Sequence, residues 1–376
     1  MQKSRQHSPT RGPLHIKRRS FQAGSSDEET ILPDQLLRSS KEPISRQKGM
    51  ATMKAIRVHN FGDSKELKYE TNVPRPKPDD NQVLVQVKAV GVNPIDPYVR
   101  TGGFGPQPFP YIPGMDFAGI VKAVGSKVTA VKPGDRVYGS TTDGMNNAYA
   151  EYIAVKESFV HPLPESLNYS QGAAIPVPYF TAYRALFHLA KAQPGETLLV
   201  HGASGGVGLA AVQLAHGMGL RVIGTAGTTA GAELVKNAGA EQVFNHREEG
   251  YLNKIKEALG EGGANIVLEN VANKNLRKDL EVVGAGGRIA LIGGLGEVAI
   301  DPLDLLMREI VIIGVIFFRM SGEQLLETRN AIQTGIEAGW ICPKIWQELP
   351  LEKASEAHDL LASGSGARGK IILKLD

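Results

Sequence analysis

The sequence predicts an α/β protein in which a module of β-strands precedes a doubly wound parallel sheet. Three observations support this fold class. Glycine accounts for 43 of the 376 residues without a three-residue repeat, which favours a glycine-punctuated α/β fold over collagen. From residue 177 onward, apolar strand patterns alternate with helical patterns of about 10–15 residues. A chain of 376 residues also has room for two or three domains, each with its own core.

The first 49 residues differ in composition from the rest. They contain ten Lys and Arg against five Asp and Glu, which leaves 32 basic and 34 acidic residues for 50–376, a balance of −2. Because they hold few large apolar residues, we expect a disordered basic extension. It is interpreted as an added or alternative-start segment before Met50, as a mitochondrial transit peptide, or as an RNA-binding arm through Lys17, Arg18 and Arg19.

Residues 54–160 are predicted to form an all-β module. The patterns at 54–62 and 82–92 alternate between apolar and polar residues, as half-buried strands do. Short strands follow within 119–139, separated by Gly, Pro and Asp turns.

The second part alternates strands and helices. A helical pattern at 179–190 precedes the strand 197–203 and the glycine-opened helix 204–219. The strand 369–376 has no local partner, so we expect the C-terminus to return to the β module. Strands are predicted at 221–228, 242–246, 265–272, 286–294 and 309–318, and helices at 231–240, 249–260, 323–339 and 351–363.

Four glycines at the junction of the strand 197–203 and the helix 204–219 predict a dinucleotide site. Gly202, Gly205, Gly206 and Gly208 provide a tight turn, an unobstructed backbone and a helix N-terminus, which together bind pyrophosphate. The spacing is G-x-x-G-x-x-G, whereas the common fingerprint is G-x-G-x-x-G. The alternative interpretation is a tight turn that only allows close packing.

NADP(H) is favoured over NAD(H) because the second strand ends at 224–229 without a carboxylate that would repel a 2′-phosphate. The turn has no Arg or Lys, so we expect a modest preference. His246 closes the third strand, where it either flanks the adenosine or serves as a surface polar residue. Asn275 and the residues Ile292, Gly293, Gly294 and Leu295 follow later strands, at the edge where open α/β sheets bind ligands.

Several long segments make the family recognisable. GVNPIDPYVRTG, YIPGMDFAG, PYFTAYRAL, HGASGGVGLAA and VFNHRE resemble the zeta-crystallin type of NADPH:quinone oxidoreductase, a zinc-free branch of the medium-chain dehydrogenase/reductase superfamily. The resemblance covers residues 50–375. It implies a GroES-like catalytic domain from residues 50–176 and 319–376, with a Rossmann NADPH-binding domain from residues 177–318.

The resemblance also implies residue roles. Tyr98 would face the nicotinamide, and Asn93 would lie in the substrate pocket. The other cofactor contacts that it implies are Ser204, Gly205, Gly206 and Val207 at the pyrophosphate, Gly227 and His246 at the adenosine, and Asn275, Ile292, Gly293, Gly294, Leu295, Val315, Ile316 and Phe317 around the ribose and nicotinamide.

No zinc site is expected. Where zinc alcohol dehydrogenases of the superfamily carry ligands, the chain has Pro113, Gly114, Met115 and Asp116, and its single cysteine, Cys342, stands alone. One cysteine favours a reducing compartment, and we expect a cytoplasmic protein unless the extension is a transit peptide. The longest apolar run, residues 310–318, falls short of the roughly 20 residues that span a membrane.

Without a metal, the expected acceptor is a conjugated system such as a quinone or an α,β-unsaturated carbonyl. Tyr98 would bond the acceptor oxygen or donate a proton, and Asn93 would position it. The alternative for Tyr98 is a half-exposed aromatic residue, and the alternative for Asn93 is an Asn that caps the turn before Pro94.

Three functions stay open: an NADPH-dependent quinone reductase, an alkenal or enone reductase, and an NADPH-binding structural or RNA-associated protein. The resemblance permits one-electron reduction of quinones. The strand 309–318, placed last in the sheet, would leave an apolar edge, so we expect a homodimer or homotetramer.

Overall fold

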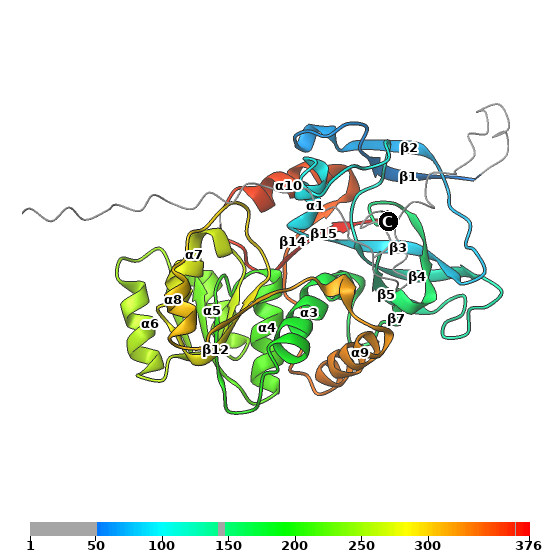
Figure 1. The fold of residues 1–376 in the computed structure, drawn as a ribbon. Helices are drawn as coiled ribbons and strands as arrows, with labels where there is room; N and C mark the ends of the chain where they lie inside the picture. Colours follow the sequence, from blue (N-terminus) through cyan, green and yellow to red (C-terminus); the bar gives the residue numbers. More distant parts are fainter. Residues whose placement is uncertain (1–50, 142–146, 365) are drawn as a thin grey trace, which may run out of the picture. The chain divides into compact units, whose positions relative to one another are not determined.

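The computed structural model describes residues 51–141, 147–364 and 366–376, and one compact unit spans Met50–Asp376 (Figure 1). The predicted disordered extension lies outside the described residues. Within that unit, two large sheets and a small one are present. None of the described helices is long and apolar enough to cross a membrane.

A seven-stranded, mainly antiparallel sheet has the order β14-β15-β3-β4-β5-β7, and β6 also pairs with β3. Val83, Val85 and Val87 of β3 are buried, as the predicted alternation requires. The pair β1 (Thr52–Arg57) and β2 (Lys68–Pro74) forms the small sheet. The large sheet contains β3 (Gln82–Val92), β4 (Asp116–Val124), β5 (Arg136–Ser140), β6 (Tyr152–Lys156), β7 (Val160–Pro162), β14 (Ile345–Pro350) and β15 (Lys370–Lys374).

The C-terminus returns to this sheet, as predicted, because β15 pairs antiparallel with β3. The expectation that β15 lacks a local partner is wrong, since β14 pairs with it in parallel. Gln347 and Glu348 of β14 are exposed, so the segment lacks the apolar alternation that marks a strand.

The prediction of an all-β module up to residue 160 is also wrong. The helix α1 (Ile95–Arg100) follows β3, and the Asn93 carbonyl accepts the Asp96 N–H at its start. Its six residues are too few for a helical period to stand out. Another short helix, α2 (Tyr169–Ala173), precedes α3 (Pro176–Tyr183), which continues into the π-helical segment η5 (Arg184–Leu189).

A six-stranded parallel sheet confirms the predicted doubly wound fold. Leu198 and Val200 of β8 belong to the core beneath α4, whereas Leu199 between them belongs to the core that contains Ile255 of α6. Both faces of the sheet are therefore covered. The strands are β8 (Thr197–Val200), β9 (Arg221–Ala226), β10 (Gln242–Asn245), β11 (Ala264–Glu269), β12 (Val283–Leu291) and β13 (Val311–Gly314).

The strand order β10-β9-β8-β11-β12-β13 reverses direction between β8 and β11. Ligands of such sheets bind beyond the carboxyl ends of the strands at this reversal. The helices associated with the sheet are α4 (Gly206–Gly217), α5 (Thr229–Asn237), α6 (Tyr251–Leu259), α7 (Ala272–Asp279) and α8 (Pro302–Leu306), and α9 (Gly322–Glu337) and α10 (Ala354–Ala362) follow (Figure 1).

Candidate dinucleotide and acceptor site

The glycine-rich turn leads from β8 into α4 at the reversal point. Gly202 has a φ of +63°, which favours glycine. A Cβ on Gly208 would lie 2.5 Å from the Gly202 carbonyl oxygen, so glycine is required for close packing there. Gly205 is the N-cap of α4 and has no side chain to occupy the helix start. The turn therefore presents free backbone N–H groups where an anion such as pyrophosphate fits.

This turn also contacts the C-terminal segment. The Gly369 N–H donates to the Ser204 carbonyl at 2.9 Å, and Gly205 forms a bridge with Gly369. The start of β15 therefore borders the turn, although these residues lie far apart in the sequence.

Gly227 and His246 lie together, as expected for two residues on the adenosine side. A Cβ on Gly227 would lie 2.8 Å from His246 Nε2 and 2.9 Å from Arg247 Nε. Burial, followed by the Arg247 charge, lowers the pKa of His246. Arg247 was not among the predicted site residues, because it follows β10 and lies outside the turn after β9 where a cation would be expected. It follows His246 directly and places a guanidinium beside that turn.

An open cavity of about 480 Å³ lies where β12 and β13 end. Five of the predicted contacts line it, namely Ile292, Gly293, Gly294, Val315 and Ile316. Two arginines that the sequence analysis did not select, Arg184 and Arg319, also line it.

The remaining predicted residues of this region lie around that cavity or away from it. Asn275 on α7 donates to Glu269 Oε1 at 3.3 Å, and the backbone of Ile292 is bonded to the Glu269 carbonyl. Leu295 is largely exposed and does not line the cavity. Phe317 is buried and lines a second cavity of about 60 Å³ together with His161 and Phe180.

Asn93 is held in a buried polar network rather than left free. Its Nδ2 donates to Asp116 Oδ2 at 2.9 Å and to the Gly91 carbonyl at 3.3 Å, while Lys370 Nζ donates to its Oδ1. Both amide hydrogens are therefore in use. Only one lone pair of Oδ1 is left, and it can accept a hydrogen bond from a ligand hydroxyl or N–H group.

Two carboxylates of this network are strongly affected by burial. Asp96 accepts the Asn93 N–H at 2.8 Å and the Tyr149 hydroxyl at 3.0 Å. Burial raises the pKa of Asp96 to about 7 and also raises the pKa of Asp116, against the opposing effect of Lys370. Lys370 and Asp116 were not predicted as site residues, because their pairing with Asn93 exists only after β15 joins β3.

Tyr98 lies on α1 and is partly exposed. Its ring packs edge-on against Phe104, with 6.3 Å between ring centroids. A Cβ on Gly103 would lie 2.2 Å from the Tyr98 ring, so this glycine gives the ring its space. Among the described residues, no group bonds the Tyr98 hydroxyl, which is therefore available to a ligand.

A buried cluster that the sequence analysis missed lies behind the strand ends. His201 Nε2 is 3.1 Å from Asp279 Oδ1, and the ligand atoms of His201, Asp279 and Glu269 lie within 4.8 Å of one another. Burial and the charge of Asp279 raise the pKa of Glu269 to about 7. Glu269 also accepts the Val271 N–H, so the cluster fixes the chain after β11.

Two family models match the chain. "Alcohol dehydrogenase GroES-like domain" matches residues 79–165, and "Zinc-binding dehydrogenase" matches residues 206–332.

Among curated proteins, the chain is 48% identical to human quinone oxidoreductase, over 87% of this chain and 99% of that protein. It is 30% identical to a tomato 2-methylene-furan-3-one reductase, over 93% of this chain and 87% of that protein. Among solved structures, Escherichia coli quinone oxidoreductase complexed with NADPH superimposes with a TM-score of 0.77 at 29% identity, over 86% of this chain and all of that one.

Proposed function

The chain belongs to the zeta-crystallin-type quinone oxidoreductases of the medium-chain dehydrogenase/reductase superfamily, and from this premise we propose that it reduces quinones with NADPH. One observation carries the proposal. The Gly227 turn after β9, the glycine-rich turn after β8 and the open cavity at the ends of β12 and β13 lie in this order along the carboxyl edge of a single sheet. Such a series of sites suits a dinucleotide, with its pyrophosphate at the α4 N-terminus.

NADPH is proposed over NADH because of Arg247. A 2′-phosphate at the Gly227 turn would meet its guanidinium, and a guanidinium binds phosphate with two parallel hydrogen bonds. Thr228 caps α5 by accepting the Gly231 N–H at 3.1 Å, so a second helix N-terminus faces the same turn. No carboxylate lies in residues 224–229 to compete.

The chain's own residues would bind and orient NADPH and the acceptor, and would exclude water from the site. Bound NADPH supplies the reducing equivalents. Tyr98, whose hydroxyl is available, would bond the acceptor oxygen. Asn93 would act mainly as a positioning residue, because Asp116 and Lys370 hold its amide. No zinc is proposed, since Asp116 is already paired with Lys370 and Pro113, Gly114 and Met115 offer no ligand of the kind zinc prefers.

A steady-state acceptor panel tests the proposal. NADPH oxidation is measured with 9,10-phenanthrenequinone and with 2-alkenals, and the panel is repeated with NADH. We expect faster turnover with the quinone and with NADPH. Faster turnover with alkenals would replace the proposed acceptor class, and tight NADPH binding without turnover would remove the enzymatic role.

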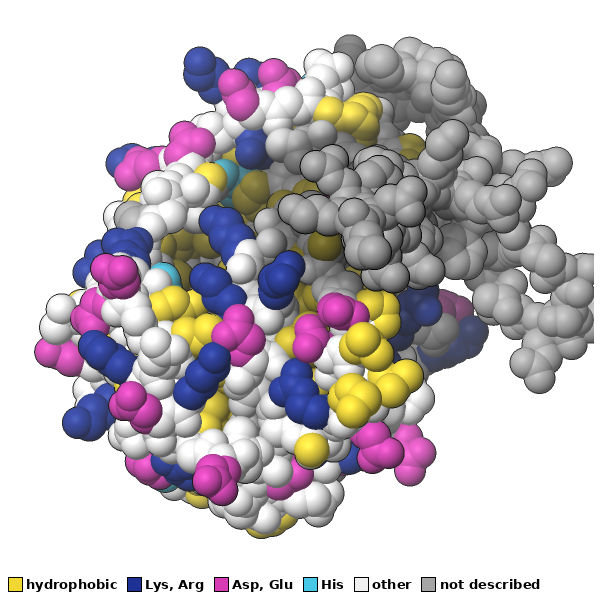
Figure 2. Space-filling model, turned by 60° about the vertical axis from the view of Figure 1, so that its left-hand side comes forward, with side chains coloured by type: hydrophobic (Ala, Val, Ile, Leu, Met, Phe, Trp, Pro, Cys, Tyr) yellow, Lys and Arg dark blue, Asp and Glu magenta, His cyan; other side chains and the backbone are white. Residues whose placement is uncertain are grey.

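An enone reductase is the second candidate, because the tomato relative is named for reduction of an enone. A structural or RNA-associated role has less support. Basic and acidic side chains are interspersed on the face drawn in Figure 2, and the balance of residues 50–376 is −2. Such a surface lacks the basic field that nucleic acid requires.

We further propose a homo-oligomer, either a dimer or a tetramer. The strand β13 is the edge of the parallel sheet, and Leu303, Leu306, Met307 and Val311 expose half or more of their surface near it. Pairing of two β13 edges would cover them. Light scattering at micromolar concentration tests this, and a monomeric mass would contradict it. A cytoplasmic location stays a prediction.

A further inference from the structure

The open cavity at the ends of β12 and β13 has a cationic side. Arg184 from η5 and Arg319 from the short helix η6 (Phe317–Arg319) both line it, together with the apolar side chains of Leu291, Val315 and Ile316. Within the described ranges, no carboxylate lies at ion-pair distance from either guanidinium. The cavity therefore combines an apolar wall with two positive charges that no protein anion neutralises.

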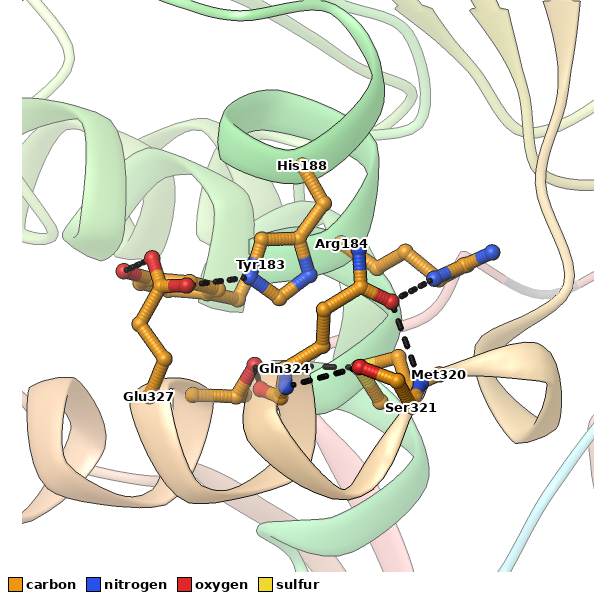
Figure 3. A network of polar contacts seen from close by, with 8 residues as sticks. Tyr183, Arg184, His188, Met320, Ser321, Gln324 and Glu327 are labelled. Atoms are coloured by element: carbon orange, nitrogen blue, oxygen red, sulfur yellow. Dashed lines mark hydrogen bonds and ion pairs between the residues drawn. The ribbon is translucent and has the colours of Figure 1, made fainter.

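The position of Arg184 is fixed by α9. Its Nη1 donates to Gln324 Oε1 at 3.0 Å, and the same oxygen accepts the Ser321 N–H at 3.2 Å. Glu327, three residues after Gln324 on α9, is bonded instead to the Tyr183 hydroxyl at 3.0 Å and lies 3.2 Å from His188 Nε2. Figure 3 shows the Arg184 guanidinium extending away from Glu327. Arg184 is therefore hydrogen-bonded to the neutral amide of Gln324, while the Glu327 carboxylate contacts Tyr183 and His188.

Arg184 is also partly desolvated. Its Nε is buried and, among the described residues, has no hydrogen-bond partner. Burial and the neighbouring charge of Arg319 lower the pKa of Arg184. Arg319 is exposed, and within the described part of the chain no hydrogen bond or ion pair neutralises it. Two like charges that face one cavity repel each other, and a bound anion relieves that repulsion.

We propose that this cavity recognises a carboxylate or sulfonate group on an aromatic acceptor, through Arg184 and Arg319. This inference rests on the proposed quinone reductase function and names a substrate class for it. The guanidinium fork matches the two oxygens of a carboxylate, while the acceptor ring would lie against the nicotinamide that Val315 and Ile316 are proposed to border. A phosphate of the dinucleotide carries similar chemistry, so the experiment must distinguish these two sources of the anion.

The test compares 9,10-phenanthrenequinone with its 2-carboxylate, at saturating NADPH, in the wild type and in Arg319→Gln. We expect Arg319→Gln to raise KM for the carboxylate about tenfold, equivalent to the loss of about 1.4 kcal/mol, and to raise KM for the uncharged quinone by a much smaller factor. Lys236→Gln on α5 removes the same charge from an exposed position and should change neither KM.

Arg184→Gln should give the same selective loss. Because Arg184 also contacts α9, the melting temperature and circular dichroism spectrum of the variant serve as the check that the fold is intact. An equal rise in KM for both acceptors, or a raised KM for NADPH, would assign the arginines to the cofactor and overturn the proposal. Calorimetric binding of the carboxylate, with and without Arg319→Gln, needs no turnover, so it separates failure of this inference from failure of the proposed function.

Discussion

Lys370 Nζ lies 3.1 Å from Asp116 Oδ2, and both side chains are almost completely buried. The pair joins β15 to β4 across a sequence separation of 254 residues. Each partner also bonds the side chain of Asn93, so the last strand of the chain determines how this candidate site residue is held.

Lys370→Met should destabilise the protein strongly. It leaves the Asp116 carboxylate buried without its cation, which typically costs about 3 to 5 kcal/mol of unfolding free energy. Urea unfolding at neutral pH measures this. Lys374→Met on the same strand is the control, because Lys374 pairs with Glu348 at an exposed site and should cost less than about 1 kcal/mol. Recovery of stability in the double variant with Asp116→Asn would support the pairing, and equal losses in Lys370→Met and Lys374→Met would contradict it.

Asp96 should make stability depend on pH. Its pKa is raised by burial from 3.8 to about 7 in the folded protein, so the folded state retains a proton that the unfolded chain loses above about pH 4. The unfolding free energy should therefore fall as pH rises from 4 to 7. Each pKa unit corresponds to about 1.4 kcal/mol of unfolding free energy. Because the charges of Asp116 and Lys370 also act on Asp96, we expect less than the full shift implies, a fall in unfolding free energy of about 2 kcal/mol.

Asp96→Asn should flatten this pH profile, because the amide still accepts the two hydrogen bonds but does not titrate. Asp135→Asn is the matched control. The pKa of Asp135 is lowered by the Lys132 N–H, so its contribution is lost only at more acidic pH. A profile between pH 4.5 and 7 with the same slope in wild type and Asp96→Asn would rule out this role.

Arg247→Gln should weaken NADPH binding while NADH binding is unchanged. A hydrogen bond to a charged group is worth about 1.5–3 kcal/mol, so the Kd for NADPH should rise about tenfold or more. Fluorescence titration with both nucleotides gives the ratio. Arg277→Gln removes an exposed arginine of α7 and should leave both constants as they are. A parallel loss of NADH affinity would instead assign Arg247 to the adenosine or ribose.

The fold was predictable where a pattern repeats over several residues. The strand and helix alternation predicts the parallel sheet, since most of its strands contain apolar runs and most of its helices are long enough to show a period. The strand β14 was not predictable because its sequence lacks an apolar alternation, and the helix α1 was not predictable because six residues are too few to show a period.

The candidate site divides in the same way. The glycine turn is local and was recognised from residues 202–208. Arg247, Arg184 and Lys370 each lie beside site residues that are distant from them in sequence. The topology of the fold alone brings these residues together. Nothing in the residues around Asn93 indicates that a lysine 277 positions away holds its amide.

Gly208→Ala and Gly205→Ala should separate folding from cofactor binding. At Gly208 a Cβ would meet backbone atoms of Gly202 and Ala203 at 2.5 and 2.6 Å, so overpacking should cost about 1 to 3 kcal/mol. At Gly205 the nearest atom lies 3.5 Å away, and the loss should be about 0.5 kcal/mol. Gly205→Ala should nevertheless weaken NADPH binding, because its methyl group would stand at the helix start. Unchanged NADPH affinity in Gly205→Ala would argue against pyrophosphate at this turn.

Tyr98→Phe distinguishes the two candidate reactions. Its hydroxyl has no partner among the described residues and its ring packs on Phe104, so the substitution removes only the group that faces a ligand. If the hydroxyl donates a proton to an enone, alkenal turnover should fall about a hundredfold, the usual range of general acid catalysis. One-electron reduction of a quinone needs no such proton at the electron-transfer step, so that rate should fall only slightly. Tyr251→Phe on α6 should alter neither reaction. Equal losses with both acceptors would show that Tyr98 orients the bound molecules and does not donate the proton.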